Sequence, residues 1–182
     1  MTAVMPAGHP YPLLARLTVE KYLAGDGPPD SLPAEVSPDM AIWSIRRACF
    51  VTIKTSEGDL RGCIGTIVPV QPDLGREIMV NAVSAATRDP RFSPMSGLEL
   101  PRAGFSVDVL GQPELVRDLG ELDPSVWGVI VTRDGRRGLL LPDLEGVDTV
   151  EAQLSIAARK AGLRGYDGAE IQRFSVTRYP ER

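Results

Sequence analysis

Alternating apolar and polar positions predict that the first strands of the chain pair as a β-hairpin. Residues 50–54 read FVTIK, a composition typical of strands, and residues 60–65 read LRGCIG. Between them, the segment SEG at 56–58 favours a turn, in which Gly58 would supply the positive φ of a short loop. We therefore expect two antiparallel strands joined by a tight connection.

The register of this hairpin decides which side chains share a face. If Thr55 pairs with Asp59, then Cys63 lies opposite Val51, and side chains alternate across each strand. Arg61 and Cys63 would then share one sheet face with Cys49, Val51 and Ile53. The other face would take Leu60, Ile64 and Thr66.

Apolar residues recur at helical spacing in three further segments. One helix is expected after a disordered tail over residues 1–12, and a second is capped by Asp73 and stops before Pro90. A third begins at a capping box formed by Asp148 and Glu151. The expected helices cover residues 13–23, 74–88 and 149–161.

Strand patterns account for most of the remaining chain. A second hairpin is expected around the turn Asp134-Gly135. The further strands cover residues 104–110, 126–132, 138–141 and 171–179. Because the strands come as hairpins separated by helices, we expect an α+β fold in which helices flank an antiparallel sheet.

Composition is that of an ordinary globular protein. The chain has 182 residues, of which 43% are hydrophobic and 24% charged, enough for one domain or two small lobes. No apolar run approaches the roughly 18 residues that span a bilayer, and the N-terminus lacks the pattern of a signal peptide. We therefore expect a cytoplasmic protein with no membrane partner.

The charge pattern argues against a nucleic-acid partner. The formal net charge is −4, and the arginines are spread along the chain. Their densest cluster, Arg133, Arg136 and Arg137, falls beside Asp134 at the expected hairpin tip, so we interpret it as a solvated turn.

The chain offers little of the usual catalytic or metal-binding chemistry. Its single histidine, His9, lies in the expected tail, which argues against a cysteine–histidine dyad or a histidine-rich metal site. We expect no metal and no cofactor. Cys49 and Cys63 would lie diagonally on one sheet face, which leaves a reversible disulfide open.

Two glycines flank Cys63 inside the predicted strand. Glycine weakens a strand interior, so Gly62 and Gly65 indicate a close approach by another backbone or by a ligand. A core too crowded for a side chain is the alternative interpretation, and both stay open.

Four motifs together resemble the AMMECR domain family: LRGCIG at 60–65, DPRF at 89–92, GLLLP at 138–142 and KAGL at 160–163. The resemblance implies a single AMMECR-type domain over residues 13–182. It also implies a larger subdomain that contains both termini, a smaller inserted one, and a cleft between them that the LRGCIG side chains face. The family has no established biochemical activity.

The resemblance also implies partners. Bacterial and archaeal relatives resemble parts of a three-component set with a Memo-type protein and a radical-SAM protein, which suggests a modification system of unknown substrate. A homodimer is open as well. One departure lies in SIAARKAGL at 155–163, where many family members carry a cysteine before KAGL, and this weakens a mechanism with two thiols.

The predicted site is the cleft face that carries LRGCIG, closed by the DPRF loop. Its ligand-binding residues are expected to be Arg61, Gly62, Cys63, Ile64, Gly65, Asp89, Arg91 and Phe92. A planar guanidinium suits a carboxylate or phosphate, so the first hypothesis is a module that binds a peptide, a protein or a sizeable anionic ligand. The alternative is an enzyme whose nucleophile is Cys63, activated by a neighbouring cation.

Overall fold

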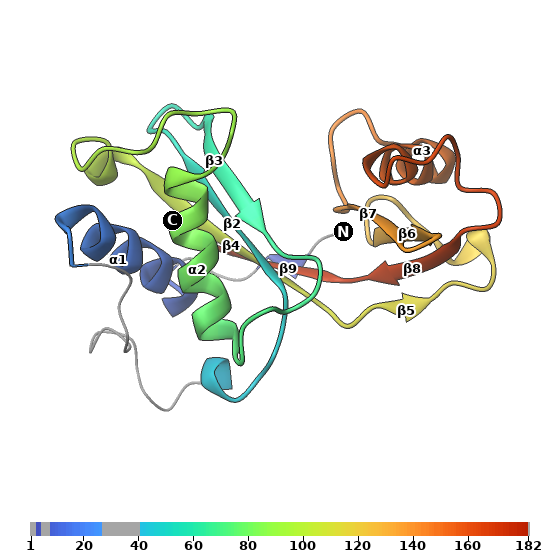
Figure 1. Cartoon of the computed structure of the whole chain (residues 1–182), viewed down its shortest axis with the longest axis horizontal. Coiled ribbons are helices and arrows are strands. Elements are labelled where there is room, and N and C mark those ends of the chain that lie inside the picture. The colour runs from blue at the N-terminus through green and yellow to red at the C-terminus, as the bar shows by residue number, and fades with distance from the viewer. Residues whose placement is uncertain (1–2, 5–7, 27–40, 182) are drawn as a thin grey trace. The chain divides into compact units, whose positions relative to one another are not determined.

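The computed structural model describes residues 3–4, 8–26 and 41–181. The chain divides into two compact units (Figure 1). The large unit consists of Val4–Val109 and Arg178–Arg182, and the small unit of Met1–Ala3 and Leu110–Thr177. Each unit has its own cluster of buried hydrophobic side chains.

The sheet of the large unit has five strands in the order β1-β9-β4-β2-β3. These strands are β1 (Ala3–Val4), β2 (Cys49–Lys54), β3 (Leu60–Gly65), β4 (Gly104–Leu110) and β9 (Val176–Pro180). Its α-helices are α1 (Pro10–Ala24) and α2 (Leu74–Thr87), and its 3-10 helices are η1 (Ala41–Trp43) and η2 (Leu100–Arg102).

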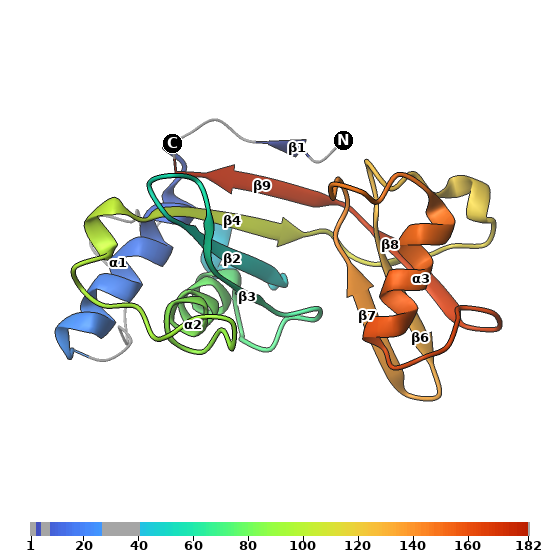
Figure 2. The ribbon, with the colours of Figure 1, turned by 90° about the horizontal axis from the view of Figure 1, so that it is seen from above.

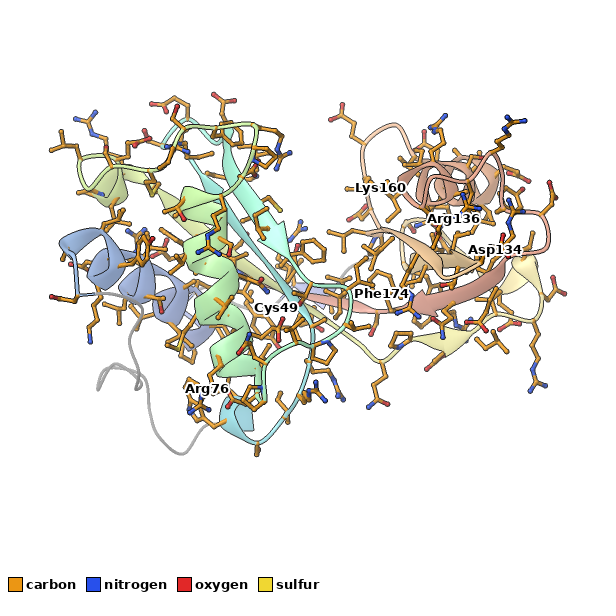
Figure 3. All side chains as sticks on the ribbon, in the orientation of Figure 1. Cys49, Arg76, Asp134, Arg136, Lys160 and Phe174 are labelled. Atoms are coloured by element: carbon orange, nitrogen blue, oxygen red, sulfur yellow. The ribbon has the colours of Figure 1, made fainter. Side chains whose placement is uncertain are left out.

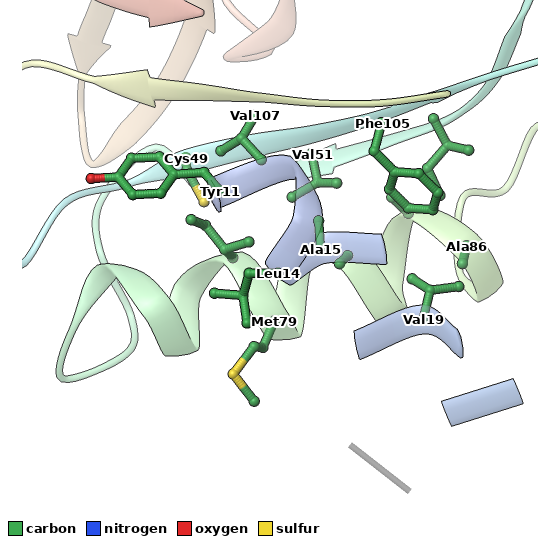
Figure 4. Close-up of a cluster of buried hydrophobic side chains, with 14 of the residues drawn as sticks. Tyr11, Leu14, Ala15, Val19, Cys49, Val51, Met79, Ala86, Phe105 and Val107 are labelled. Atoms are coloured by element: carbon green, nitrogen blue, oxygen red, sulfur yellow. The ribbon is translucent and has the colours of Figure 1, made fainter. Parts of the chain in front are cut away.

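Both α-helices lie on the same side of this sheet (Figure 2). The core fills the space between them and the strands. Leu14 from α1 and Met79 from α2 meet Val51 from β2 and Val107 from β4 (Figure 4). This packing buries the face of the sheet that points toward the helices.

Helix α1 begins earlier than the sequence predicts. His9 caps it, because its Nδ1 accepts the Tyr11 N–H at 3.4 Å. Residues Ala3–Val4 form β1, and α1 starts at Pro10. The predicted disordered tail over residues 1–12 is therefore wrong for residues 3–4 and 10–12. Residues 1–2 and 5–7 lie outside the described part of the chain.

Helix α2 follows its prediction closely. The Asp73 carboxylate accepts the Arg76 N–H at 2.8 Å, and the helix ends at Thr87, just before the Asp89-Pro90 pair. Its buried face includes three small side chains that allow a strand to approach closely: Ala82, Ala85 and Ala86.

The β2–β3 hairpin contains a bulge that the sequence analysis missed. Near the turn, the Thr55 N–H donates to the Asp59 carbonyl at 2.8 Å, as expected. Further along, Ile53 pairs with Gly62 rather than with Arg61. Arg61 is therefore an extra residue on β3, and it shifts the register by one position.

This shift moves Cys63 to the other face of the sheet. Cys63 lies opposite Thr52, not opposite Val51. The predicted grouping of Cys63 with Cys49, Val51 and Ile53 is wrong, because those three side chains are fully buried in the core. Both cysteines are free, and the sheet separates their side chains, which removes the geometry for the disulfide that the sequence left open.

The small unit has a four-stranded sheet in the order β5-β8-β6-β7. Its elements are β5 (Glu114–Leu115), η3 (Leu119–Glu121), β6 (Gly128–Arg133), β7 (Arg136–Leu140), α3 (Val150–Lys160) and β8 (Glu170–Phe174). Helix α3 packs on β6 and β7, and Val129, Val131 and Leu154 belong to the core between them.

Two predictions for this part of the chain need correction. The expected final strand is two strands that enter different sheets, β8 and β9, with a break at Ser175. The N-cap of α3 is Thr149 instead of Asp148, and its hydroxyl accepts the Ala152 N–H at 3.1 Å.

The hairpin tip of the small unit is confirmed. Asp134 and Gly135 have φ of 53° and 73°, the left-handed values of a tight turn. Arg136 and Asp134 stand together at this tip (Figure 3), where their charged groups lie 3.6 Å apart. The arginine cluster is thus partly neutralised and exposed, as expected of a solvated turn.

The α+β class is confirmed: three α-helices accompany two sheets in the described part of the chain, and every strand pair with a described register is antiparallel. Within the described residues, none of the helices combines the length and apolar character that crossing a membrane requires.

Candidate ligand-binding site

The sheet of the large unit has a second face, which points away from α1 and α2. We call it the open face and define it by Phe50, Thr52, Lys54, Cys63 and Ser106. Cys63, Thr52 and Ser106 stand side by side on β3, β2 and β4 in the observed register. The Thr52 hydroxyl donates to the Cys63 Sγ at 3.3 Å. The thiol of the LRGCIG motif is therefore half-buried on this face.

Packing explains both glycines of the motif. A Cβ on Gly62 would collide with the carbonyl oxygen of Ala85, so β3 and α2 touch backbone to backbone at this point. A Cβ on Gly65 would collide with the ring of Phe50. Of the two interpretations that the sequence left open, the close approach of another backbone holds for Gly62, and crowding by a side chain accounts for Gly65. Ile64 lies on the same side as Gly62 and packs against the core.

The Arg61 guanidinium is already engaged. Its Nε donates to Glu99 Oε1 at 2.6 Å, and a second nitrogen donates to the Ser93 carbonyl at 3.0 Å. The Arg61 side chain is 15% exposed. Hydrogen bonds from Arg61, then from Ser96, lower the pKa of Glu99 to about 2. Arg61 thus ties the bulge of β3 to the segment that leads into η2.

The DPRF loop closes the outer edge of β3. Asp89 Oδ2 accepts the Cys63 N–H at 2.8 Å, and the Asp89 carboxylate also accepts two guanidinium hydrogen bonds from Arg91, at 2.9 and 2.7 Å. These bonds, those from Arg91 first, hold the pKa of Asp89 well below its usual range although the carboxyl group is buried. An ion pair between Asp89 and Arg91 thus locks the loop internally.

Phe92 lies between the two arginines. The guanidinium carbons of Arg61 and Arg91 lie 5.8 and 5.6 Å from the centre of its ring, within the range of cation–π attraction. The ring is half-buried. Arg61, Asp89, Arg91 and Phe92 therefore form one interlocked support for the strand that carries Cys63.

A cavity of about 590 Å³ lies along β2, β4 and β9, within the large unit. Three residues of the open face line it: Thr52, Lys54 and Ser106. Arg102 from η2 and Arg178 from β9 also line it. Its volume is within the range of roughly 300–1,000 Å³ that is typical of small-molecule sites.

Cationic groups predominate in the lining of this cavity. Lys54 and Arg102 are exposed, and neither is in a described ion pair. Arg178 donates two hydrogen bonds to the buried Asp108, at 2.8 and 2.9 Å. The one carboxylate of the lining, Glu181, is paired with Arg16. The cavity therefore combines positive charge with the hydroxyl groups of the open face.

The family model described as AMMECR1 matches residues 13–180. The chain belongs to the AMMECR1 family. A protein of Thermotoga maritima is 49% identical over 175 residues, which cover 94% of this chain and 97% of that protein. A longer protein of Clostridium acetobutylicum is 46% identical over 173 residues, which cover 94% of this chain and 36% of that protein.

The fold is shared with a solved member of comparable size. The crystal structure of the uncharacterized protein PH0010 from Pyrococcus horikoshii has a TM-score of 0.78 and 29% identity, and the match covers 92% of this chain and 88% of that one.

Within this AMMECR1 domain, the structure brings together most of the predicted site residues, but in different roles. Cys63 and Gly65 belong to the open face, whereas Gly62 and Ile64 face the core. The four residues of the interlocked support contact one another, through the Asp89–Arg91 ion pair and through the Phe92 ring between the two guanidinium groups. The three cations of the cavity were missed. Alternation along β2 could have placed Lys54 opposite the core, but Arg102 and Arg178 reach the cavity only through the tertiary fold.

The second thiol of the AMMECR1 domain, Cys49, is buried in the core and does not line this cavity. Burial raises the pKa of the Cys49 thiol to about 12, so this group stays protonated. Among the described residues, no cluster of histidine, cysteine and acidic side chains could hold a metal ion.

Proposed function

We propose that this AMMECR1 domain is a non-catalytic binding module that holds a sizeable anionic ligand on the open face of its large unit. The observation that carries the proposal is the cavity lined by Lys54, Arg102 and Arg178 beside Thr52 and Ser106. Cations with nearby hydroxyl donors are the groups that bind carboxylates and phosphates.

The charge balance of the cavity favours an anion. Asp108 holds Arg178 in place, Arg16 neutralises Glu181, and the attraction between Arg102 and the exposed Glu57 is screened by solvent, so Lys54 and Arg102 can bind an incoming group. This moves the anion-binding role from Arg61, which already bonds to Glu99 and Ser93, to residues at the end of β2 and in η2. Charge-assisted hydrogen bonds of this kind contribute about 1.5–3 kcal/mol each.

The arrangement around Cys63 favours binding over nucleophilic catalysis. A cysteine nucleophile needs a base or a cation that stabilises its thiolate. Asp89 has both carboxylate oxygens bonded to Arg91 or to the Cys63 N–H, and Arg91, a cation whose charge acts on Cys63, is itself paired with that carboxylate. The Cys63 Sγ accepts a hydrogen bond from the Thr52 hydroxyl, and Thr52 also lines the cavity. Cys63 is thus a neighbour of the bound ligand in this proposal.

The proposal leaves a place for the partners that the family resemblance implies. A module that holds an anionic substrate would serve a Memo-type or radical-SAM partner as the component that presents that substrate. The cleft between subdomains expected from the resemblance is a separate prediction, since the cavity argued here is built from the large unit alone.

The test is calorimetric titration with tripolyphosphate, a compact polyanion, at low ionic strength. The double variant Lys54→Ala/Arg102→Ala should bind at least about tenfold more weakly than the native protein, since about 1.4 kcal/mol corresponds to one decade. Arg137→Ala, which removes an exposed arginine from the small unit, is the matched control and should bind like the native protein. Equal binding by the double variant and the native protein would overturn the proposal.

A further inference from the structure

A second, smaller cavity of about 260 Å³ adjoins the cationic one. The two share the residues at the turn of the hairpin and the end of η2, namely Lys54, Thr55, Ser56, Arg102 and Ala103. A ligand with its anionic group between Lys54 and Arg102 therefore has direct access to the smaller cavity.

The smaller cavity presents an apolar wall. Met95 and Ala103 are buried beneath it, and Leu98 stands 90% exposed at its edge. A leucine this exposed leaves most of its side chain in water, so a ligand that covered it would gain from burying apolar surface. Single exposed leucines are common, but this one adjoins buried apolar groups and a pair of cations. Two carboxylates also line the cavity: Glu99 is paired with Arg61, and Glu57 is exposed to solvent.

The segment that carries Leu98 is held in place. Glu99 accepts Arg61 Nε on one oxygen, and on the other it accepts the Ser96 N–H at 2.7 Å and the Ser96 hydroxyl at 2.9 Å. These bonds bracket Leu98 on both sides. Its side chain is thus presented beside the cavity by a pinned turn, which is the arrangement that a binding contact needs.

We infer that the ligand is an amphiphilic anion: a carboxylate or phosphate group attached to an aliphatic group of a few carbons. The anionic group lies between Lys54 and Arg102, and the aliphatic group packs on Leu98, Met95 and Ala103. This inference rests on the proposed function and adds the second half of the ligand. A free alkyl acid and the C-terminal residue of a peptide both have this chemistry.

The test compares inorganic phosphate, hexyl phosphate and hexanol by NMR titration of the native protein. Hexyl phosphate should bind about tenfold more tightly than inorganic phosphate, and hexanol should not bind measurably by itself. Leu98→Ser should remove this gain and leave the affinity for inorganic phosphate unchanged. Leu119→Ser, which changes an exposed leucine of the small unit, should keep the gain.

A second arm separates the two sources of the ligand. Acetyl-glycyl-leucine with a free carboxylate is compared with its C-terminal amide and with hexanoate. If the natural ligand is a peptide C-terminus, the peptide acid should bind more tightly than both its amide and hexanoate. If it is a free alkyl acid, hexanoate should bind more tightly than the peptide acid.

The outcomes distinguish this inference from the proposed function. If inorganic phosphate and hexyl phosphate bind equally and Leu98→Ser changes neither, the amphiphilic ligand is wrong while the anion site stands. If neither compound perturbs residues 54–56 or 102–106, both the site and the inference fail.

Discussion

Asp89 accepts the backbone N–H of Cys63 through Oδ2 at 2.8 Å. A carboxylate from the loop after α2 thus satisfies a donor on the exposed edge of β3, where the sheet has no further strand. Arg91 in turn neutralises this carboxylate from the solvent side. The LRGCIG and DPRF motifs are therefore two halves of one structural lock next to the open face.

Removing the carboxylate of this lock should destabilise the protein. Asp89→Ala leaves the Cys63 N–H without its partner and the Arg91 guanidinium without its counter-charge, so we expect a loss of about 2–4 kcal/mol in the free energy of unfolding. Urea denaturation followed by circular dichroism measures it. Glu114→Ala, which breaks an exposed ion pair with Arg173, is the control and should change stability by less than about 1 kcal/mol. Equal effects of the two substitutions would contradict the lock.

A side chain at Gly62 should not be tolerated. In Gly62→Val the new atoms would meet the Ala85 carbonyl oxygen, and a backbone atom cannot move aside as a flexible side chain can. We expect insoluble or unfolded protein, judged by soluble yield and circular dichroism. Gly97→Ala is the matched control, because a Cβ there meets nothing within 4 Å. A folded Gly62→Val protein with native stability would show that β3 and α2 are not in close contact.

The two thiols should differ in reactivity. Iodoacetamide should modify the half-buried Cys63 in the folded protein, whereas Cys49, fully buried and with its pKa raised to about 12, should react only after unfolding. Intact-protein mass spectrometry should show one adduct in buffer and two in urea. Cys63→Ser should keep the fold and show no adduct in buffer. Rapid double labelling of the native protein would place Cys49 outside the core.

The ion pair of Glu99 with Arg61 should give a pH-dependent contribution to stability. Because the folded-state pKa of Glu99 is lowered from 4.5 to about 2, its contribution is present above about pH 4.5 and is lost as the pH falls toward 2. The difference in stability between the native protein and Glu99→Gln should therefore vanish near pH 2. It should not exceed about 1 kcal/mol at pH 7, since the side chain of Glu99 is 40% exposed. A difference that grows on acidification would contradict this assignment.

Local rules were sufficient for the elements that carry their own signals. Asp73 caps α2, Pro90 keeps the helix from continuing, and Asp134-Gly135 makes a turn, each through chemistry within a few residues. These features are encoded over short distances, and so the sequence predicts them with their boundaries.

The site depended on information that is not local. One bulged residue, Arg61, reverses the faces of the β3 side chains, and no propensity distinguishes it from a regular strand residue. Its partner Glu99 comes from a segment without periodic pattern, and Arg178 reaches Asp108 from 70 residues away. Alternation predicted correctly that the side chains of Cys63 and Ile64 point to opposite faces of the sheet. It could not decide which of the two faces the core.

The most direct test of the central claim is a map of amide chemical shifts in the ¹⁵N-labelled protein during titration with tripolyphosphate. The account predicts saturable shifts at residues 54–56, 102–106 and 178, with smaller shifts at Thr52 and Cys63. Shifts centred instead on the Arg133–Arg137 hairpin, or on Arg61 and Arg91 with none at Lys54 and Arg102, would contradict it.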